Sequence, residues 1–207
     1  MAIGDDVKET YEEVGIPYQV EKLDTGGLFD EKCLIEKYTE QSTEFIRQRV
    51  VVVNIPYDTE AVPGDLIHLE GEEFLITSKD STRVENAVAF YRCMLYRCND
   101  FCSIYTYNPN RGYDSNYNKY PEFSLEEENV PLLFLDVSRA TEAEEIESVY
   151  LGSISGYSAY MQKRNIKEGD RIKLDDTFYL VENIHSHRLK GNFILYLQKV
   201  QDDTATY

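Results

Sequence analysis

A short hairpin pattern occurs twice in this chain, and it constrains the fold more than any other feature of the sequence. The first copy, VPGDLIHLEGEEFLI, covers residues 62–76, and the second, KEGDRIKLDDTFYLV, covers residues 167–181. In each copy a Gly-Asp turn precedes apolar residues at every second position, the period of a strand with one buried face. We align Gly64 with Gly169, Asp65 with Asp170, Ile67 with Ile172, Leu69 with Leu174, and Phe74 with Phe178, which makes the second hairpin turn one residue shorter. The sequence therefore predicts the same β-hairpin, preceded by a Gly-Asp turn, at two places in the chain.

The Gly-Asp turns could be read as binding sites, but a structural role explains them better. Glycine adopts backbone angles that other residues avoid, and an aspartate side chain caps a turn by binding nearby backbone groups. We therefore predict structural turns at Gly64, Asp65, Gly169 and Asp170.

The rest of the sequence is typical of a mainly β protein. Residues 5–14 carry apolar side chains at helical spacing and end at Gly15, which predicts a short N-terminal helix. Two or three strands are expected between residues 16 and 55, and each hairpin is followed by a further strand-like run, at residues 87–97 and 192–200. We predict two related small β-barrel or β-sandwich modules with a short N-terminal helix and a long central loop.

These features divide the chain into four expected segments. They are an N-terminal helix with strands at residues 1–55, a first β module at 56–104, a Tyr-rich excursion with an acidic linker at 105–149, and a second β module at 150–207. The third segment contains Pro and Gly breakers and many Asn residues, a composition typical of a long loop.

Tyrosines are concentrated in this central excursion. A tyrosine provides a large amphipathic contact surface at a modest entropic cost, and the residue is enriched in protein interfaces. We predict a subunit or ring interface here, and the alternative is a solvent-exposed surface loop. The candidate interface residues are Tyr105, Tyr107, Tyr113, Tyr117 and Tyr120.

The charge of the chain limits its partners. It has 38 acidic and 21 basic residues and a formal net charge of -17, which opposes a grip on phosphate backbones. A surface that faces DNA without holding it remains compatible with this charge, because repulsion lets a strand slide past. No apolar stretch reaches the roughly 18 residues that a membrane helix needs, and the acidic N-terminus lacks a secretory signal, so we expect a protein that stays in the cytoplasm where it is made.

The candidate catalytic and metal-binding residues are better explained by structural roles. Cys98 and Cys102 have zinc-like spacing, but on a strand they would lie too far apart to share one metal ion. His185 and His187 lie on one side of an extended segment without a third ligand nearby, and the acidic runs are typical of solvated faces. We found none of the common nucleophile, zinc-protease or phosphate-loop motifs. We predict no catalytic, cofactor or metal site, and therefore no enzyme.

The two hairpins resemble those of tailed-bacteriophage head-closure and head-to-tail joining proteins, also called connector or neck proteins. The resemblance is carried by residues 62–67 with 74–76, and by residues 166–172 with 178–181. The YRCN string at residues 96–99 is similar to a segment in neck or structural proteins of phages that infect Gram-positive hosts. The resemblance covers mainly residues 50–102 and 150–200.

The resemblance implies a virion protein that assembles as a homo-oligomeric ring, commonly six- or twelve-fold, between the portal and the tail. Portal or adaptor and tail proteins would be its partners, DNA would pass only as cargo in the channel, and no membrane would be involved. An acidic lumen would keep the DNA mobile. The alternatives are a tail-completion or collar protein and, in a different class, a small accessory hydrolase, which would need a pocket with convergent polar groups.

Overall fold

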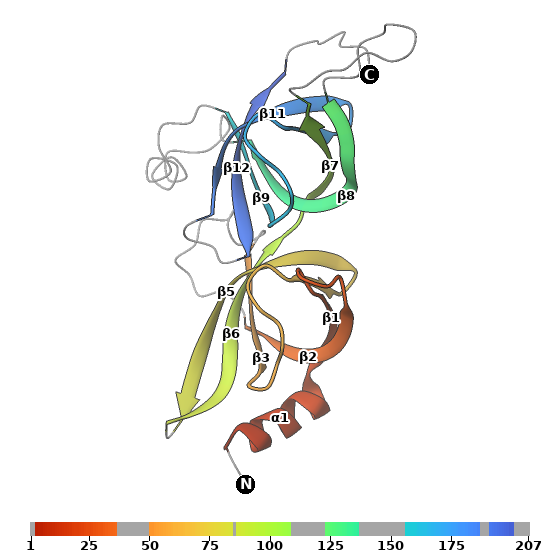
Figure 1. Cartoon of the computed structure of the whole chain (residues 1–207). Coiled ribbons are helices and arrows are strands. Elements are labelled where there is room, and N and C mark those ends of the chain that lie inside the picture. The colour runs from red at the N-terminus through yellow and green to blue at the C-terminus, as the bar shows by residue number, and fades with distance from the viewer. Residues whose placement is uncertain are drawn as a thin grey trace, which may run out of the picture. The chain divides into compact units, whose positions relative to one another are not determined.

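The computed structural model describes residues 3–36, 50–84, 86–108, 123–136, 156–186 and 191–200. Within these ranges the protein is mainly β, with one N-terminal helix and two closed barrels of six strands each (Figure 1). The elements are α1 (Ile3–Val14), β1 (Ile16–Glu21), β2 (Leu28–Glu36), β3 (Val50–Pro56), β4 (Leu66–Leu69), β5 (Glu72–Val84), β6 (Ala87–Arg97), β7 (Asp100–Tyr107), β8 (Phe123–Asp136), β9 (Tyr157–Gln162), β10 (Arg171–Leu174), β11 (Thr177–His185) and β12 (Asn192–Lys199). The prediction of a mainly β chain with two related small modules and a short helix is confirmed.

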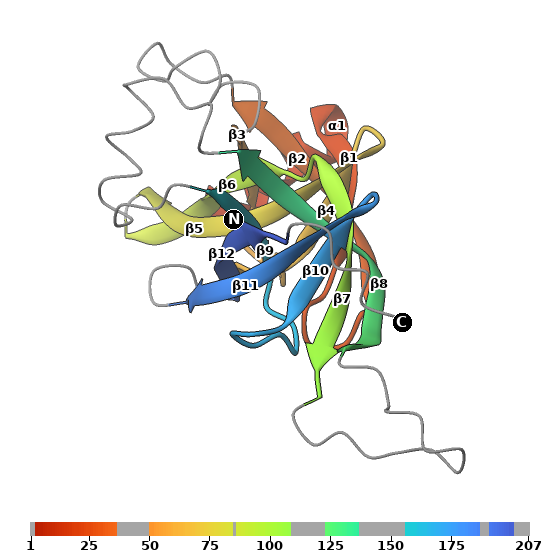
Figure 2. The same ribbon diagram turned by 90° about the horizontal axis from the view of Figure 1, so that it is seen from above.

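The two barrels share one topology. The first is closed in the order β1-β2-β3-β6-β5-β4, and the second in the order β7-β8-β9-β12-β11-β10. Each strand of the first barrel therefore has an equivalent in the second, with β1 matching β7, β4 matching β10 and β5 matching β11. Figure 2 shows β7, β10 and β11 side by side, as their strand pairing requires. The repeated hairpin in the sequence thus belongs to a repeat of the whole barrel.

The register of the hairpins corrects the predicted alignment. Ile67 pairs with Phe74 in the first hairpin, and Ile172 pairs with Tyr179 in the second, so Tyr179 and not Phe178 is equivalent to Phe74. Both hairpin turns therefore have the same length. The prediction matched one Phe to the other, and a slip of one residue moves a side chain to the opposite face of a strand. Tyr179 is accordingly buried at 8% exposure, whereas Phe178 is half-buried on the outside.

Each barrel encloses its own apolar core. Inward-facing side chains alternate with outward ones, as at Ile172 and Leu174 of β10. Fully burying one such side chain stabilises the fold by about 1.5–3 kcal/mol. The first core includes Val20, Val53, Ile55, Ile67, Ile76 and Leu95, and the second includes Ile104, Leu132, Met161, Ile172, Leu195 and Leu197.

The helix α1 packs against the first barrel. It buries Tyr11 to 3% exposure and contacts β2, β3 and β6. The N–H of Gly15 donates to the carbonyl oxygen of Tyr11 at 2.9 Å, which ends the helix where the sequence predicts. Within the described ranges, no helix has both the length and the apolar character that crossing a membrane requires.

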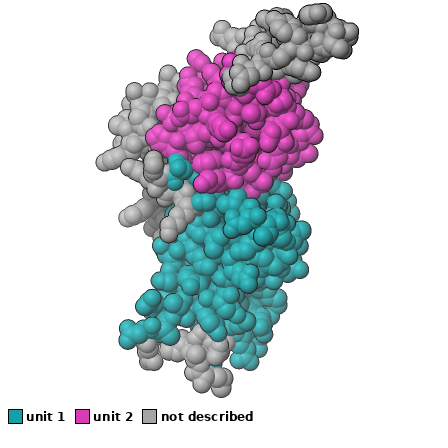
Figure 3. All heavy atoms as spheres, in the orientation of Figure 1, with its two compact units in different colours: residues 1–98, 186–192 teal, residues 99–185, 193–207 magenta. Residues whose placement is uncertain are grey.

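The chain divides into two compact units that differ from the predicted segments. Unit 1 comprises residues 1–98 and 186–192, and unit 2 comprises residues 99–185 and 193–207 (Figure 3). The predicted N-terminal segment 1–55 supplies β1, β2 and β3 to the first barrel, because a closed barrel needs all six strands.

The predicted excursion at residues 105–149 also needs correction. It contains β8, a strand of 14 residues that pairs with both β7 and β9. The acidic run at residues 126–128 hid this strand, because carboxylates are depleted in strands and were attributed to a solvated face. The central loop is therefore interrupted by one of the barrel strands.

Candidate interaction surface

Both Gly-Asp turns form the same corner at the entry to a hairpin. Gly64 has a φ of 103° and Gly169 a φ of 92°, angles that favour glycine. The N–H of Gly64 donates to the carbonyl oxygen of Ile76, and that of Gly169 donates to the carbonyl oxygen of Val181, each at 2.9 Å. The two corners are therefore equivalent in backbone geometry.

The aspartates of these corners are buried and saturated with backbone donors. Asp65, 1% exposed, accepts hydrogen bonds from the N–H groups of Val62 and Leu23, both at 2.9 Å. Asp170, 2% exposed, accepts them from the N–H groups of Lys167 at 2.7 Å and Tyr107 at 2.9 Å. Asp65 thus joins the chain after β1 to the turn before β4, and Asp170 joins the end of β7 to the turn before β10. Both carboxylates therefore have a structural role.

Two of the five candidate tyrosines lie within the described residues, and both are on β7. Tyr107 is 42% exposed, and its ring lies 5.5 Å from that of Phe123. Tyr105 is half-buried, and its ring meets that of Phe178 edge to face at 5.4 Å. The structure thus places them on the outside of the second barrel. Tyr113, Tyr117 and Tyr120 lie outside the described residues.

Further apolar side chains surround these tyrosines on the outside of the barrel. Leu125 of β8, 47% exposed, is the register partner of Tyr105. Lys173 of β10 is the register partner of Phe178, and its ammonium nitrogen lies 5.6 Å from the Phe178 ring centre. We call this surface the aromatic face, and it consists of Tyr105, Tyr107, Leu125, Lys173 and Phe178.

The first barrel carries different chemistry at the equivalent place. Glu21 pairs with Leu66 in the first barrel, and Tyr105 pairs with Arg171 in the second, so Glu21 is equivalent to Tyr105. In the same way, the pair His68–Glu73 is equivalent to the pair Lys173–Phe178. His68 lies between the two carboxylates, with Nε2 3.5 Å from Glu21 and Nδ1 3.7 Å from Glu73. We call Glu21, His68 and Glu73 the acidic face.

Sequence reasoning missed most of the aromatic face. Leu125 and Phe178 were not predicted as interface residues, because their proximity to Tyr105 depends on the pairing of β7 with β8 and of β10 with β11. The available signal was the pair of adjacent aromatic residues Phe178 and Tyr179. Successive side chains of a strand point to opposite faces, so only one of the two can lie in the barrel core and the other must lie on the outside.

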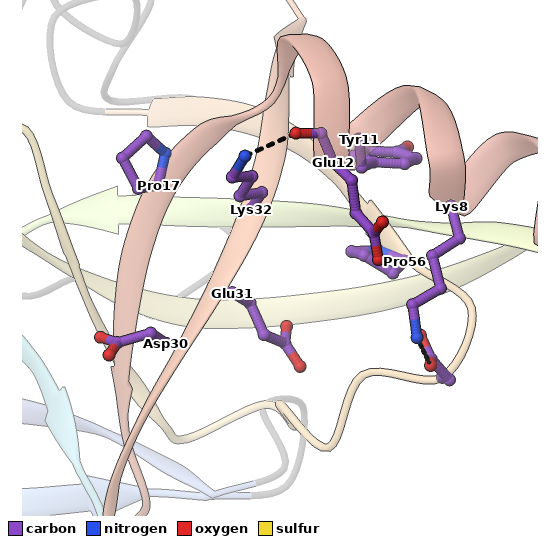
Figure 4. Close-up of a pocket in the computed structure, with 9 residues that line it drawn as sticks. Lys8, Tyr11, Glu12, Pro17, Asp30, Glu31, Lys32 and Pro56 are labelled. Carbon is purple, nitrogen blue, oxygen red and sulfur yellow. Dashed lines mark hydrogen bonds and ion pairs between the residues drawn. The ribbon is translucent and has the colours of Figure 1, made fainter.

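A pocket of about 420 Å³ lies between α1 and the first barrel (Figure 4). The cations on its wall are engaged: Lys8 forms an ion pair with Asp58 at 2.5 Å, which raises the pKa of Lys8, and Lys32 donates to the backbone oxygen of Glu12 at 2.6 Å. Glu31 accepts hydrogen bonds from the hydroxyls of Tyr18 and Thr59. These contacts fasten the helix and the loop after β3 to the barrel.

The described residues do not support a metal site at the cysteines or histidines named in the sequence analysis. Within them no three His, Cys, Asp or Glu side chains converge to hold an ion. Burial raises the pKa of the Cys98 and Cys102 thiols to about 12, which disfavours the thiolate that a metal ion needs. The ring of His185 packs edge to face on Tyr196 at 5.0 Å, and His187 lies outside the described residues.

Comparison with known proteins adds little. No protein-family model matches the chain, and no curated protein matches it. One solved structure that was found, MrkH, is titled a c-di-GMP-dependent transcription regulatory factor. It aligns over 97% of this chain and 85% of its own with 8% identity and a TM-score of 0.22, a similarity too low to bear on fold or function.

Proposed function

We propose that this protein is a ring-forming structural component of a tailed-phage neck, which joins or closes the channel between head and tail. The observation that carries the proposal is the difference between the two barrels: one topology presents an acidic face on the first copy and an aromatic face at the equivalent place on the second. A ring of identical subunits needs two unlike, complementary surfaces on each subunit.

The aromatic face suits a protein contact. Its large exposed apolar groups include Tyr107 at 42% and Leu125 at 47% exposure. Clustered exposed apolar side chains on a soluble surface mark interaction sites, and tyrosines are enriched in them.

The net charge of -17 also agrees with this role. A protein that conducts DNA must not hold it, and acidic walls repel phosphate groups instead of binding them. The resemblance of both Gly-Asp hairpins to those of joining proteins gives further support, now with the same corner geometry at Gly64 and Gly169.

The first experiment is to measure the mass and shape of the purified protein, alone and with the portal protein of the same phage. Light scattering gives the mass, and electron microscopy gives the symmetry. We expect rings, either alone or on the portal. A monomer that ignores the portal under all conditions would refute the proposal.

The same experiment separates the related alternative. A tail-completion or collar protein would form rings that bind isolated tails in place of portals. Counting bound rings on each particle by electron microscopy therefore distinguishes a head-closure position from a tail-completion position.

A further inference from the structure

We propose that the aromatic face of one copy binds the acidic face of another copy, so that the chain assembles head to tail. The inference rests on the proposed ring function and specifies its contact. The occupant of each face is a second copy of this chain. The residues that distinguish the two faces are those that differ between the barrels at equivalent positions.

The two barrels share one topology but carry different residues at these outer positions. The equivalent strands have the same pairing, yet Glu21, His68 and Glu73 in one barrel are replaced by Tyr105, Lys173 and Phe178 in the other. The barrel therefore tolerates either set on its outer surface.

The charges of the two faces are complementary. Glu21 and Glu73 are partly exposed, at 32% and 28% of their side chains, and within the described ranges neither carboxylate lies at ion-pair distance from a Lys or Arg side chain. An added cation would therefore find acceptors on this face.

The aromatic face supplies such a cation. Lys173 has 33% of its side chain exposed, and its only ion-pair partner within the described ranges, Asp176, lies 3.9 Å away and is fully exposed. A pair of that kind contributes little and is easily exchanged. The ring of Phe178 beside Lys173 would exclude water from a new ion pair and strengthen it.

A symmetric contact between like faces would be unfavourable. Two aromatic faces would bring Lys173 of both copies together, and two acidic faces would do the same with Glu21 and Glu73. Like charges juxtaposed across an interface cost binding energy, whereas the unlike pairing brings opposite charges together. A contact between two different surfaces leaves one unpaired surface of each kind at the two ends of a chain of subunits. It produces a closed ring when the rotation from one subunit to the next brings these two ends together.

The test exchanges the two faces. One variant, E21Y/H68K/E73F, gives both barrels an aromatic face, and the other, Y105E/K173H/F178E, gives both an acidic face. Each new side chain already occupies the equivalent position in the other barrel, so the fold should accept it. Each variant alone should lose self-association by about tenfold or more, and an equimolar mixture should recover it, because the two variants then alternate.

A milder pair keeps the test decisive if an exchanged variant fails to fold. Glu21→Lys and Lys173→Glu should each weaken association, and mixing them should restore part of it. Asp80→Lys and Lys199→Glu make the same charge changes at exposed positions outside both faces, and they should have little effect. Sedimentation velocity measures the association, and circular dichroism checks the fold.

Carbodiimide cross-linking of mixed isotope-labelled and unlabelled protein provides an independent measurement. We expect bonds between Lys173 of one copy and Glu21 or Glu73 of another, and the bond from Lys173 to Asp176 within one copy is the internal control. Rings that form normally from every variant would overturn this contact and leave the neck function standing. A chain that stays monomeric alone and on the portal would overturn both.

Discussion

The carboxylate of Asp170 accepts a hydrogen bond from the backbone N–H of Tyr107, with 2.9 Å between oxygen and nitrogen. Its other oxygen accepts from the N–H of Lys167 at 2.7 Å, so one buried side chain joins the end of β7 to the turn before β10. Because Tyr107 belongs to the aromatic face, the same corner fixes the backbone that presents this face.

Replacing Asp170 with alanine should lower the free energy of unfolding by about 3 kcal/mol. Two backbone N–H groups in a partly buried corner would lose a charged acceptor, and each such loss costs about 1–3 kcal/mol. The milder variant Asp170→Asn keeps one acceptor oxygen and should cost less. Urea unfolding measures the change, and Asp176→Ala, at an exposed position of the same hairpin, is the control. Equal stabilities of D170A and D176A would show that the corner bonds contribute nothing.

The two corner glycines should differ in their response to alanine. Both have positive φ values, which cost about 1–2 kcal/mol for a residue with a Cβ. A Cβ on Gly169 meets no atom within 4 Å, whereas one on Gly64 would lie 2.6 Å from the Cα of Gly191, which belongs to the same unit. Gly64→Ala should therefore destabilise the protein clearly more than Gly169→Ala. Equal thermal shifts for the two variants would contradict the close approach.

The sequence was sufficient to predict the repeated hairpin, because glycine and aspartate at Gly64, Asp65, Gly169 and Asp170 have a local structural effect. The alternation of apolar residues likewise predicted strands on both sides of each corner. The prediction that Phe178 is the equivalent of Phe74 was wrong, because it rested on the identity of the two residues. The cross-strand register makes Tyr179 the equivalent of Phe74. Register depends on pairing between strands, which no local pattern contains.

The barrel boundaries and the aromatic face could not be predicted for a related reason. Strand β8 carries the acidic run at residues 126–128, and its place in a sheet follows from the need to close the barrel between β7 and β9. The contact between Tyr105 and Phe178 joins residues far apart in the chain. Composition alone pointed to Tyr105 and Tyr107 as interface candidates, because interfaces favour tyrosine, and their interface role stays a prediction.

Leu125→Ser should weaken self-association with little effect on folding. Leu125 is 47% exposed, so the folded monomer loses few contacts, while an interface that covers it loses a buried apolar side chain. We expect the association constant to fall about tenfold, or about 1.4 kcal/mol. Val84→Ser is a matched control, because Val84 is 43% exposed on β5, away from both faces. A similar loss of association in both variants would assign the effect to general surface hydrophobicity.

The protein should lose stability when the pH rises above about 9. Burial raises the pKa of Cys33 and Cys93, in the first barrel, from 9.0 to about 12, and Cys98 and Cys102 behave alike. Between these pH values the unfolded chain has lost thiol protons that the folded protein still holds. The contribution of each thiol to stability is therefore constant below this window and falls through it as the pH rises, by about 1.4 kcal/mol per pH unit.

The variant Cys93→Ala isolates one of these thiols. Its stability at neutral pH will be lower because of the cavity, but its decline between pH 9 and 10 should be less steep by one thiol, because the unfolded state no longer gains a proton-release step there. The buried tyrosines, whose unfolded pKa is 10.0, add a decline in the same direction, but both proteins contain them, so the difference between the two slopes reports the thiol. Urea unfolding at several pH values gives both slopes. Parallel slopes for the two proteins would mean that Cys93 ionises equally in the folded and unfolded chains, and hence that the first barrel admits water to its core at this position.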